Sequence, residues 1–114
     1  MARRKDHTRE ELTRMAIDAG CELVAGKGPS ALTARKVATQ MGYTAGTLYN
    51  LFENIDELAA AINIRSMEAF AQKITAIRGS KAIAETQLRQ IAEAYLAFQE
   101  TEQHLWTLLF ATPL

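Results

Sequence analysis

Hydrophobic residues recur at helical spacing along nearly the whole chain, and no long stretch alternates polar and apolar positions. This pattern predicts an all-α fold. The first helix is expected to begin at Thr8, where Thr8-Arg9-Glu10-Glu11 has the pattern of a capping box, and to end at Gly26-Lys27-Gly28-Pro29. Its apolar face contains several very small residues, which allow another helix to approach closely. These residues are Leu12, Ala16, Ala19, Gly20, Leu23 and Val24.

Two short helices are predicted next. Thr33 is a suitable N-cap for a helix that continues to Met41 and ends at Gly42, and Thr44 is a suitable cap for a helix that reaches Phe52. Val37, Ala38 and Met41 point one way from the first of these helices. Leu48, Leu51 and Phe52 point back from the second, so the two are expected to pack against each other.

Three further helices are predicted in the second half. A long one is expected to begin after Asn54 and to reach about Ile77, before a break at Gly79 and Ser80. The apolar face of the next helix follows steps of four and three residues: Ala84, Leu88, Ile91, Tyr95 and Phe98. A last segment, from about Thr101, is apolar nearly all round and is therefore expected to be buried. Its apolar residues are Leu105, Trp106, Leu108, Leu109 and Phe110.

Composition narrows the class of protein. The 114 residues suit one domain, and 13 basic residues balance 13 acidic ones. Residues 1–52 nevertheless carry eight basic and five acidic side chains, a distribution that permits nucleic-acid binding. No apolar stretch is long enough to cross a bilayer, and the basic N-terminus lacks the apolar segment of a signal peptide. Because no membrane span or signal peptide is found, we expect a soluble, cytoplasmic protein. The single cysteine cannot form an internal disulfide, no zinc-type spacing of Cys and His is present, and we expect no metal and no cofactor.

The spacing of Ala38, Gly42 and Leu48 is that of a helix-turn-helix. A small residue lets the two helices cross closely, glycine permits a left-handed turn, and the aliphatic residue fixes the second helix on the first. These three positions alone suit a helical hairpin without a DNA role equally well. No acidic residue lies between Glu22 and Glu53, however, and the second helix starts with small and hydroxyl-bearing residues that suit a major groove.

The chain resembles the TetR family of bacterial transcription regulators over roughly residues 8–62. The resemblance rests on five motifs: Glu22-Leu23-Val24-Ala25-Gly26-Lys27-Gly28, Leu32-Thr33-Ala34-Arg35-Lys36-Val37-Ala38, Gly42-Tyr43-Thr44-Ala45-Gly46-Thr47-Leu48-Tyr49, Phe52-Glu53-Asn54 and Asp56-Glu57-Leu58. It departs from the family in having Leu51 where histidine is frequent and Ile55 where lysine is frequent.

The resemblance implies a three-helix DNA-binding head, a long connecting helix and an all-helical regulatory body. We therefore expect an N-terminal arm and helix-turn-helix domain over residues 1–53, and a connecting helix with part of a regulatory and dimerisation domain over 54–114. Members bind palindromic operators on double-stranded DNA as homodimers and are usually released by a small-molecule effector. By position, the DNA-binding residues would be Thr33, Arg35, Lys36, Thr44, Ala45, Gly46, Thr47 and Tyr49. Because members are longer and carry pocket and dimer helices beyond this length, we expect the chain to be part of a longer protein.

Other residues allow two interpretations each. The arm Arg3, Arg4 and Lys5 either is solvated or contacts the minor groove or phosphates. Tyr95, Phe98, Trp106 and Phe110 either belong to the core or line an effector pocket.

Cys21 is expected to be a buried thiol rather than a redox sensor. His7 is expected to be solvated unless it reaches DNA with the arm. His104 has no partners from which to build a metal site.

Together these features predict a transcriptional repressor that responds to a small-molecule effector. An architectural or division-linked DNA-binding protein without an effector is the alternative. No carboxylate pair, nucleophile–base pair or phosphate-binding glycine loop suggests an enzyme.

Overall fold

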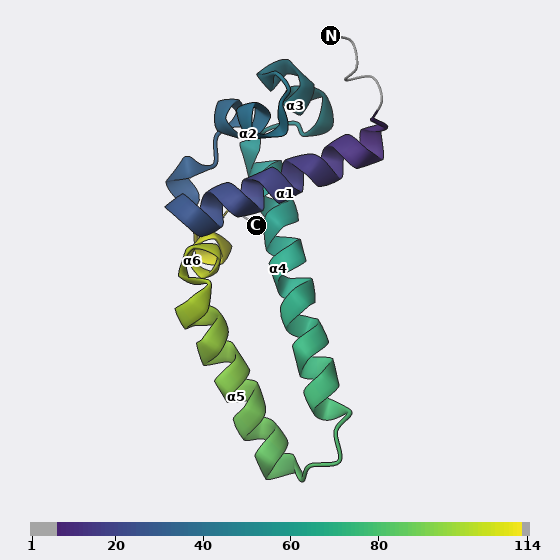
Figure 1. Cartoon of the computed structure of the whole chain (residues 1–114). Helices are drawn as coiled ribbons and strands as arrows, with labels where there is room; N and C mark the ends of the chain where they lie inside the picture. Colours follow the sequence, from purple (N-terminus) through teal and green to yellow (C-terminus); the bar gives the residue numbers. More distant parts are fainter. Residues whose placement is uncertain (1–6, 113–114) are drawn as a thin grey trace.

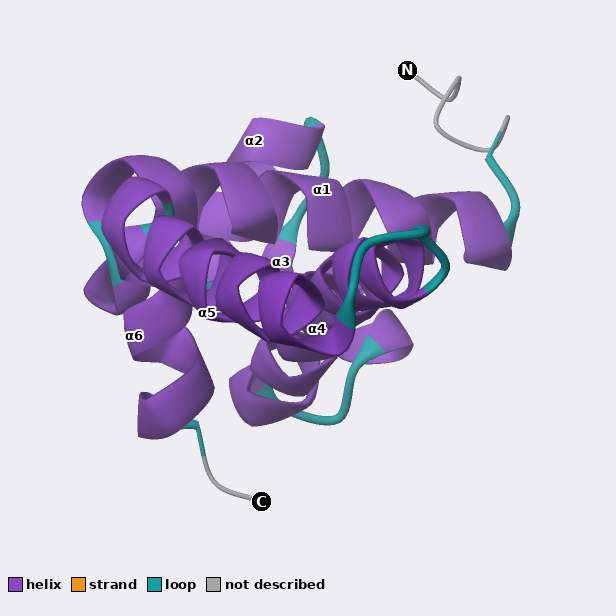
Figure 2. Cartoon of the chain, turned by 90° about the horizontal axis from the view of Figure 1, so that it is seen from below, coloured by secondary structure: helices purple, strands orange, loops and turns teal. Residues whose placement is uncertain are grey.

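The computed structural model describes residues 7–112, and within that range it contains six α-helices, one short 3-10 turn and no strand. Figure 2 shows that these helices are joined by short loops. The all-α prediction is confirmed. The elements are α1 (Arg9–Lys27), η2 (Pro29–Ala31), α2 (Ala34–Met41), α3 (Ala45–Leu51), α4 (Ile55–Arg78), α5 (Ala84–Thr101) and α6 (Gln103–Ala111).

The molecule is elongated, with extents of 57 × 27 × 23 Å. Helices α1, α2 and α3 form a head at one end, and α4 runs out from beneath α1 (Figure 1). Helix α5 returns beside α4 in the opposite direction, and α6 lies against the C-terminal part of α1. The last described helix is thus brought back to the head.

Side-chain caps start three of the helices at the predicted places. The Thr8 hydroxyl accepts from the Glu11 amide at 3.1 Å, and the Glu11 carboxylate accepts from the Thr8 amide at 2.8 Å, which completes the capping box. The Asn54 side chain accepts from the Glu57 amide at 3.0 Å and starts α4. Each such cap stabilises its helix by about 1 kcal/mol, so local sequence fixes these boundaries.

The core lies where α1 crosses α4. A Cβ atom placed on Gly20 would be only 2.7 Å from Cδ1 of Ile62, so the small face of α1 does admit a second helix at close range, as predicted. Val24 and Leu58 are also fully buried here. Leu108 of α6 belongs to the same cluster and is 4% exposed.

Helix α6 is held to α1 by a polar contact as well. His104 Nδ1 lies 3.1 Å from the carbonyl oxygen of Ala25 in the last turn of α1. This carbonyl is one of the helix-terminal acceptors that α1 cannot satisfy internally. His104, which has no metal partners in the sequence, thus serves as a structural link.

The expected burial of the last segment is wrong. Leu108 is the buried residue of α6, whereas Phe110 is 73% exposed. Helix α6 packs on α1, α4 and α5 along one side, and no described element covers its other side. An all-round apolar sequence therefore does not give all-round burial here.

The predicted face of α5 is also partly wrong. Leu88 and Tyr95 are 68% and 46% exposed, while Gln87 and Ala94 are half-buried instead. The Gln87 amide nitrogen donates to the carbonyl oxygens of Ser80 at 3.2 Å and Ala82 at 3.0 Å. These bonds hold Gln87 at the α4–α5 loop, and the apolar stripe of α5 lies partly toward solvent.

Candidate nucleic-acid interface

Helices α2 and α3 form the turn that the spacing of Ala38, Gly42 and Leu48 predicts. Gly42 ends α2 in the left-handed conformation with φ 84°, and the next amide, of Tyr43, donates to the Ala38 carbonyl at 2.9 Å. Ala38 and Leu48 are 2% and 3% exposed and lie in the core cluster. The geometry is that of a helix-turn-helix.

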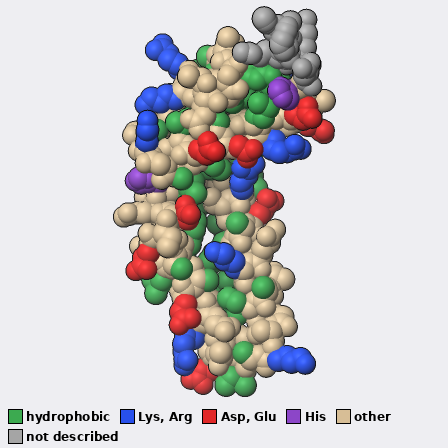
Figure 3. Space-filling model, viewed as in Figure 1, with side chains coloured by type: hydrophobic (Ala, Val, Ile, Leu, Met, Phe, Trp, Pro, Cys, Tyr) green, Lys and Arg blue, Asp and Glu red, His purple; other side chains and the backbone are tan. Residues whose placement is uncertain are grey.

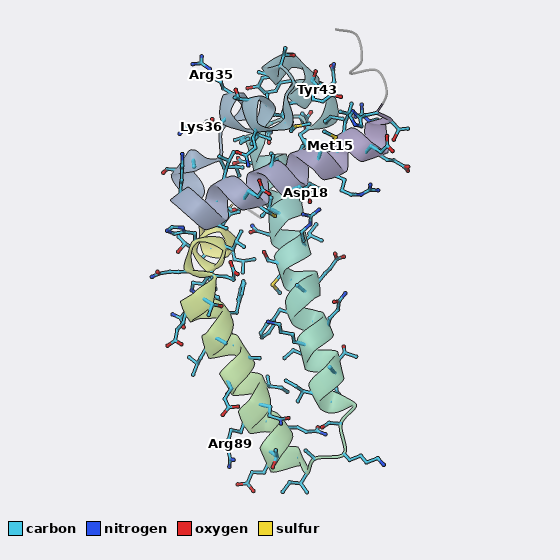
Figure 4. The ribbon with its side chains drawn as sticks, viewed as in Figure 1. Met15, Asp18, Arg35, Lys36, Tyr43 and Arg89 are labelled. Carbon is cyan, nitrogen blue, oxygen red and sulfur yellow. The ribbon has the colours of Figure 1, made fainter. Side chains whose placement is uncertain are left out.

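The predicted DNA-binding residues lie on the outer side of α2 and α3. Figure 4 shows Arg35 and Lys36 projecting from α2 away from the rest of the head. Ala45 and Thr47 are half-buried and the others are exposed: Thr33, Arg35, Lys36, Thr44, Gly46 and Tyr49. The structure thus brings all eight to one end of the molecule.

The first turn of α3 presents two hydroxyls side by side. The Oγ1 atoms of Thr44 and Thr47 are 3.5 Å apart, and the Thr47 amide donates to the Thr44 carbonyl at 3.1 Å. The Thr44 side chain does not cap the helix, so its hydroxyl is available to an outside partner. Thr33, in contrast, accepts from the Lys36 amide at 3.2 Å and caps α2.

Gly46 has no structural reason to be glycine. A Cβ atom there would meet Thr44 Oγ1 at 3.7 Å, which is ordinary van der Waals contact, and the residue does not have a positive φ. Gly20 and Gly42 differ, because the first is crowded by Ile62 and the second has a positive φ. The space above Gly46 is therefore free for another molecule to approach the α3 backbone.

The charge around this surface is positive. The stretch from residue 23 to residue 52 contains Lys27, Arg35 and Lys36 and no acidic residue. Figure 3 shows Lys and Arg side chains along the α2 edge of the head. Glu22, the last acidic residue before this stretch, accepts from the Gln40 amide at 2.6 Å and is held on α1.

One contact beside the turn is not foreseeable from spacing. His7 Nδ1 lies 2.6 Å from the Tyr43 hydroxyl, and the two rings meet edge to face at 6.1 Å. His7 is exposed to solvent, as expected, but its ring also has a partner within the protein. The two residues are 36 positions apart, so no local pattern relates them. The arm residues Arg3, Arg4 and Lys5 lie outside the described residues.

The two departures from the family pattern have a packing role. Leu51 and Ile55 are half-buried, and both pack against the core cluster together with Phe52. They attach α3 and the start of α4 to the head. At these two positions apolar contact therefore replaces the polar side chain that is frequent in the family.

The four aromatic residues predicted as an effector pocket do line one cavity. Its volume is about 290 Å³, and Met67, Phe70 and Leu109 complete its wall. The Trp106 ring lies 5.0 Å from that of Tyr95 and 4.9 Å from that of Phe110. We call this cavity the aromatic groove. Its lining contains no charged side chain, so it suits an apolar or aromatic molecule.

Cys21 is half-buried on α1. Burial raises the pKa of its thiol, against the opposing effect of the Arg65 guanidinium. A raised pKa leaves less thiolate at neutral pH, which favours the structural interpretation over redox sensing. Among residues 7–112 no group of His, Cys, Asp and Glu side chains could hold a metal ion. No helix within the described part of the chain is long and apolar enough to cross a membrane.

An exposed helix-turn-helix with positive charge around it, in a described structure made of helices, is typical of helix-turn-helix DNA-binding proteins. Residues 16–62, which run from α1 into α4, match the family model described as "Bacterial regulatory proteins, tetR family". Over these residues the chain is similar to the TetR family, and the match supports a DNA-binding transcriptional regulator. A comparison with curated proteins gave no match.

Proposed function

We propose that the protein is a transcriptional repressor that binds a palindromic operator as a homodimer in the bacterial cytoplasm and is released by a small-molecule effector. The observation that supports base recognition by α3 is the free space at Gly46. Neither packing nor backbone conformation requires glycine there, and the exposed Thr44 and the half-buried Thr47 lie on either side of it. A backbone that approaches base edges needs such space, and nothing within the described protein needs it.

Within this proposal the head residues divide into two roles. Thr44, Ala45, Gly46 and Thr47 face base edges, because they form the exposed start of α3. The phosphate backbone is held by Thr33, Arg35, Lys36 and Tyr49. The 59% exposure of Tyr49 supports its role, because its hydroxyl can reach a phosphate outside the protein. Arg3, Arg4 and Lys5 add phosphate or minor-groove contacts, since His7, two residues beyond Lys5, is held at Tyr43 beside α3.

The remaining residues form the regulatory part. We assign the arm and head to residues 1–53 and the connecting helix with part of the regulatory and dimerisation domain to 54–114. The aromatic groove is the proposed effector site, because it gathers seven apolar residues around about 290 Å³ at the base of the head. Helix α4, which lines the groove and packs on α1, provides the mechanical connection to the DNA-binding residues.

Selection from a random DNA pool, followed by footprinting on the DNA upstream of the protein's own gene, tests this function. A repressor selects an inverted repeat and protects one or two sites near a promoter. Many dispersed sites without a common sequence would instead indicate an architectural DNA-binding protein. Selection of no DNA at all, by protein shown to be folded by circular dichroism, would contradict both.

A further inference from the structure

A second cavity lies at the junction of α1, α4, α5 and α6, and we call it the junction cavity. Its volume is about 260 Å³, near the lower end for small-molecule sites. Phe70 and Phe98 line both this cavity and the aromatic groove. Unlike the groove, the junction cavity contains charged side chains, so the two spaces suit different chemistry.

The cations of the junction cavity lie on one side of α4. Arg65 and Lys73 are eight residues apart, which is just over two helical turns and about 12 Å along the axis. Ala69 lies between them on the same face, and its small side chain leaves the space open. Glu102 supplies the one carboxylate of the lining. Within the lining, two cations face one anion beside two phenyl rings, so a small aromatic anion suits the cavity once Arg65 is released from its carboxylate partner on α1.

Arg65 also connects the cavity to the head. Its Nη1 atom lies 2.5 Å from Oδ1 of Asp18 on α1 and 3.9 Å from Sγ of Cys21. Figure 4 shows Asp18 on the part of α1 that crosses α4. The ion pair therefore spans the joint between the first helix of the head and the connecting helix.

We propose that the junction cavity binds a small aromatic carboxylate, whose anionic group displaces Asp18 from Arg65 and loosens α1 from α4. This inference rests on the proposed function, because the loosened joint acts by lowering operator affinity. The ion pair is suited to exchange: the Arg65 and Asp18 side chains are 41% and 57% exposed, so water already competes for both. A ligand competes better than water when its aromatic body packs on the phenyl rings and its carboxylate lies at Arg65 on the Lys73 side of the cavity.

The effect has an upper bound and must be reciprocal. A ligand shifts DNA affinity only by as much as it changes the contacts between α1 and α4. For a half-exposed ion pair this change corresponds to about fivefold or less in affinity. By thermodynamic linkage, bound operator DNA weakens ligand binding by the same factor. A graded modulation is therefore expected rather than complete release.

The test uses 2-naphthoate as the probe and its neutral analogue 2-naphthamide as the control. Operator affinity is measured by fluorescence anisotropy on a DNA fragment that the protein itself selects from a random pool, at one fixed salt concentration. We expect saturating 2-naphthoate to lower DNA affinity about twofold to fivefold and 2-naphthamide to have no effect. Equal effects of the two compounds, or no effect of either, would contradict the proposal that a ligand carboxylate displaces Asp18 from Arg65.

Variants separate ligand binding from the ion-pair relay, by which we mean the displacement of Asp18 from Arg65 and its effect on DNA affinity. Asp18→Asn is expected to lower DNA affinity about twofold to fivefold without ligand and to abolish the response to 2-naphthoate. The same change should tighten 2-naphthoate binding in calorimetry, because Arg65 is no longer shared. Lys73→Met is expected to weaken that binding. Arg89→Gln removes a cation from α5 outside the cavity and is the matched control, with both affinities unchanged.

The outcomes distinguish this inference from the proposed function. If the protein selects no DNA, the proposed function fails, and calorimetry on the Lys73→Met and Asp18→Asn proteins still tests the cavity. If DNA binding is intact and Asp18→Asn matches the unaltered protein in every measurement, the ion-pair relay alone fails. Because Asp18 is 57% exposed on its side chain, its substitution leaves the fold intact, which circular dichroism verifies.

Discussion

At the residue scale, three glycines of this chain differ in why the position lacks a side chain. At Gly20 the cause is packing, because Ile62 Cδ1 would lie 2.7 Å from a Cβ atom. At Gly42 the cause is the backbone, since φ is 84° where α2 turns toward α3. At Gly46 neither cause applies, and the free space lies on the proposed DNA-facing surface. Substitutions at these positions therefore have different expected consequences.

Gly46→Leu should leave the folded protein intact and strongly reduce its DNA affinity. The leucine side chain extends into solvent, where only Thr44 Oγ1 is near, but it blocks approach of the α3 backbone to the groove. Thermal unfolding and gel-shift titration check both parts. Gly20→Val is the comparison, and it should destabilise the fold by about 1–3 kcal/mol because the core is overpacked. Unfolding of the Gly46→Leu protein would show that Gly46 has a structural role.

Thr47→Ala should change the ranking of operator variants, because the proposed function places the Thr47 side chain at base edges. Lys36→Ala should instead weaken binding to all sequences by similar factors and reduce the slope of log affinity against log salt by about 0.9. Affinities for a panel of operator variants at several salt concentrations measure both effects. Uniform losses for Thr47→Ala would count against base reading at that position.

Cys21 should react with iodoacetamide more slowly than an exposed cysteine. Burial raises the pKa of its thiol, so the reactive thiolate is less populated at any pH below that value. The pH at which alkylation is half-maximal should therefore lie above the ordinary value for cysteine and return to that value in denaturant. A rate in the native protein equal to the denatured rate at neutral pH would contradict the burial argument.

At the element scale, local signals and long-range packing differ in how well sequence predicts them. Side-chain hydrogen bonds within four residues set the starts of α1, α2 and α4, so Thr8, Thr33 and Asn54 are recognisable from the sequence alone. The faces of α5 and α6 depend on which elements pack against them. Gln87 is half-buried through bonds to the α4–α5 loop, which hydrophobic periodicity does not contain.

The candidate site follows the same division. That the eight head residues lie together on α2 and α3 was predictable, because the helix-turn-helix spacing and motifs lie within one continuous stretch. The His7–Tyr43 and Arg65–Asp18 contacts join residues 36 and 47 positions apart, so they depend on how α1 lies across the rest of the head and on α4. Only the three-dimensional arrangement brings such pairs together.

Helix α6 should contribute to stability through one side only. Leu108→Ala removes a side chain that is 4% exposed and should lower the free energy of unfolding by about 2–5 kcal/mol. Phe110→Ala is the matched control on the same helix, and it should cost far less because Phe110 is 73% exposed. Denaturant unfolding compares the two. A larger loss for Phe110→Ala would show that its exposed ring has a partner in solution.

At the scale of the whole molecule, the exposed apolar side chains are concentrated beyond the head. Met67, Tyr95, Leu96 and Phe110 are between 46% and 73% exposed, and three of them line the aromatic groove. Figure 3 also shows hydrophobic side chains between α4 and α5 on the displayed face. Contiguous apolar surface of this kind promotes association.

In the absence of an effector, the 114-residue chain should therefore associate with itself through the exposed apolar residues of the aromatic groove. Sedimentation velocity at increasing concentration should show a growing fraction of larger species, and Phe110→Ser should reduce it. Ile83→Ser is the control, because Ile83 is 67% exposed but lies in the α4–α5 loop, away from the groove. A concentration-independent monomer, or an equal effect of both substitutions, would contradict association through the groove.

The contact of α6 with the head also has a consequence for synthesis. Leu108 fills the core on which α1 and α4 pack, and His104 contacts the end of α1. A nascent chain that has emerged only as far as α5 contains every residue of the helix-turn-helix but lacks part of the core beneath it. The DNA-binding surface therefore reaches its full stability only after α6 has left the ribosome. Chains halted before that point should be left with an open core and be preferred substrates for proteolysis.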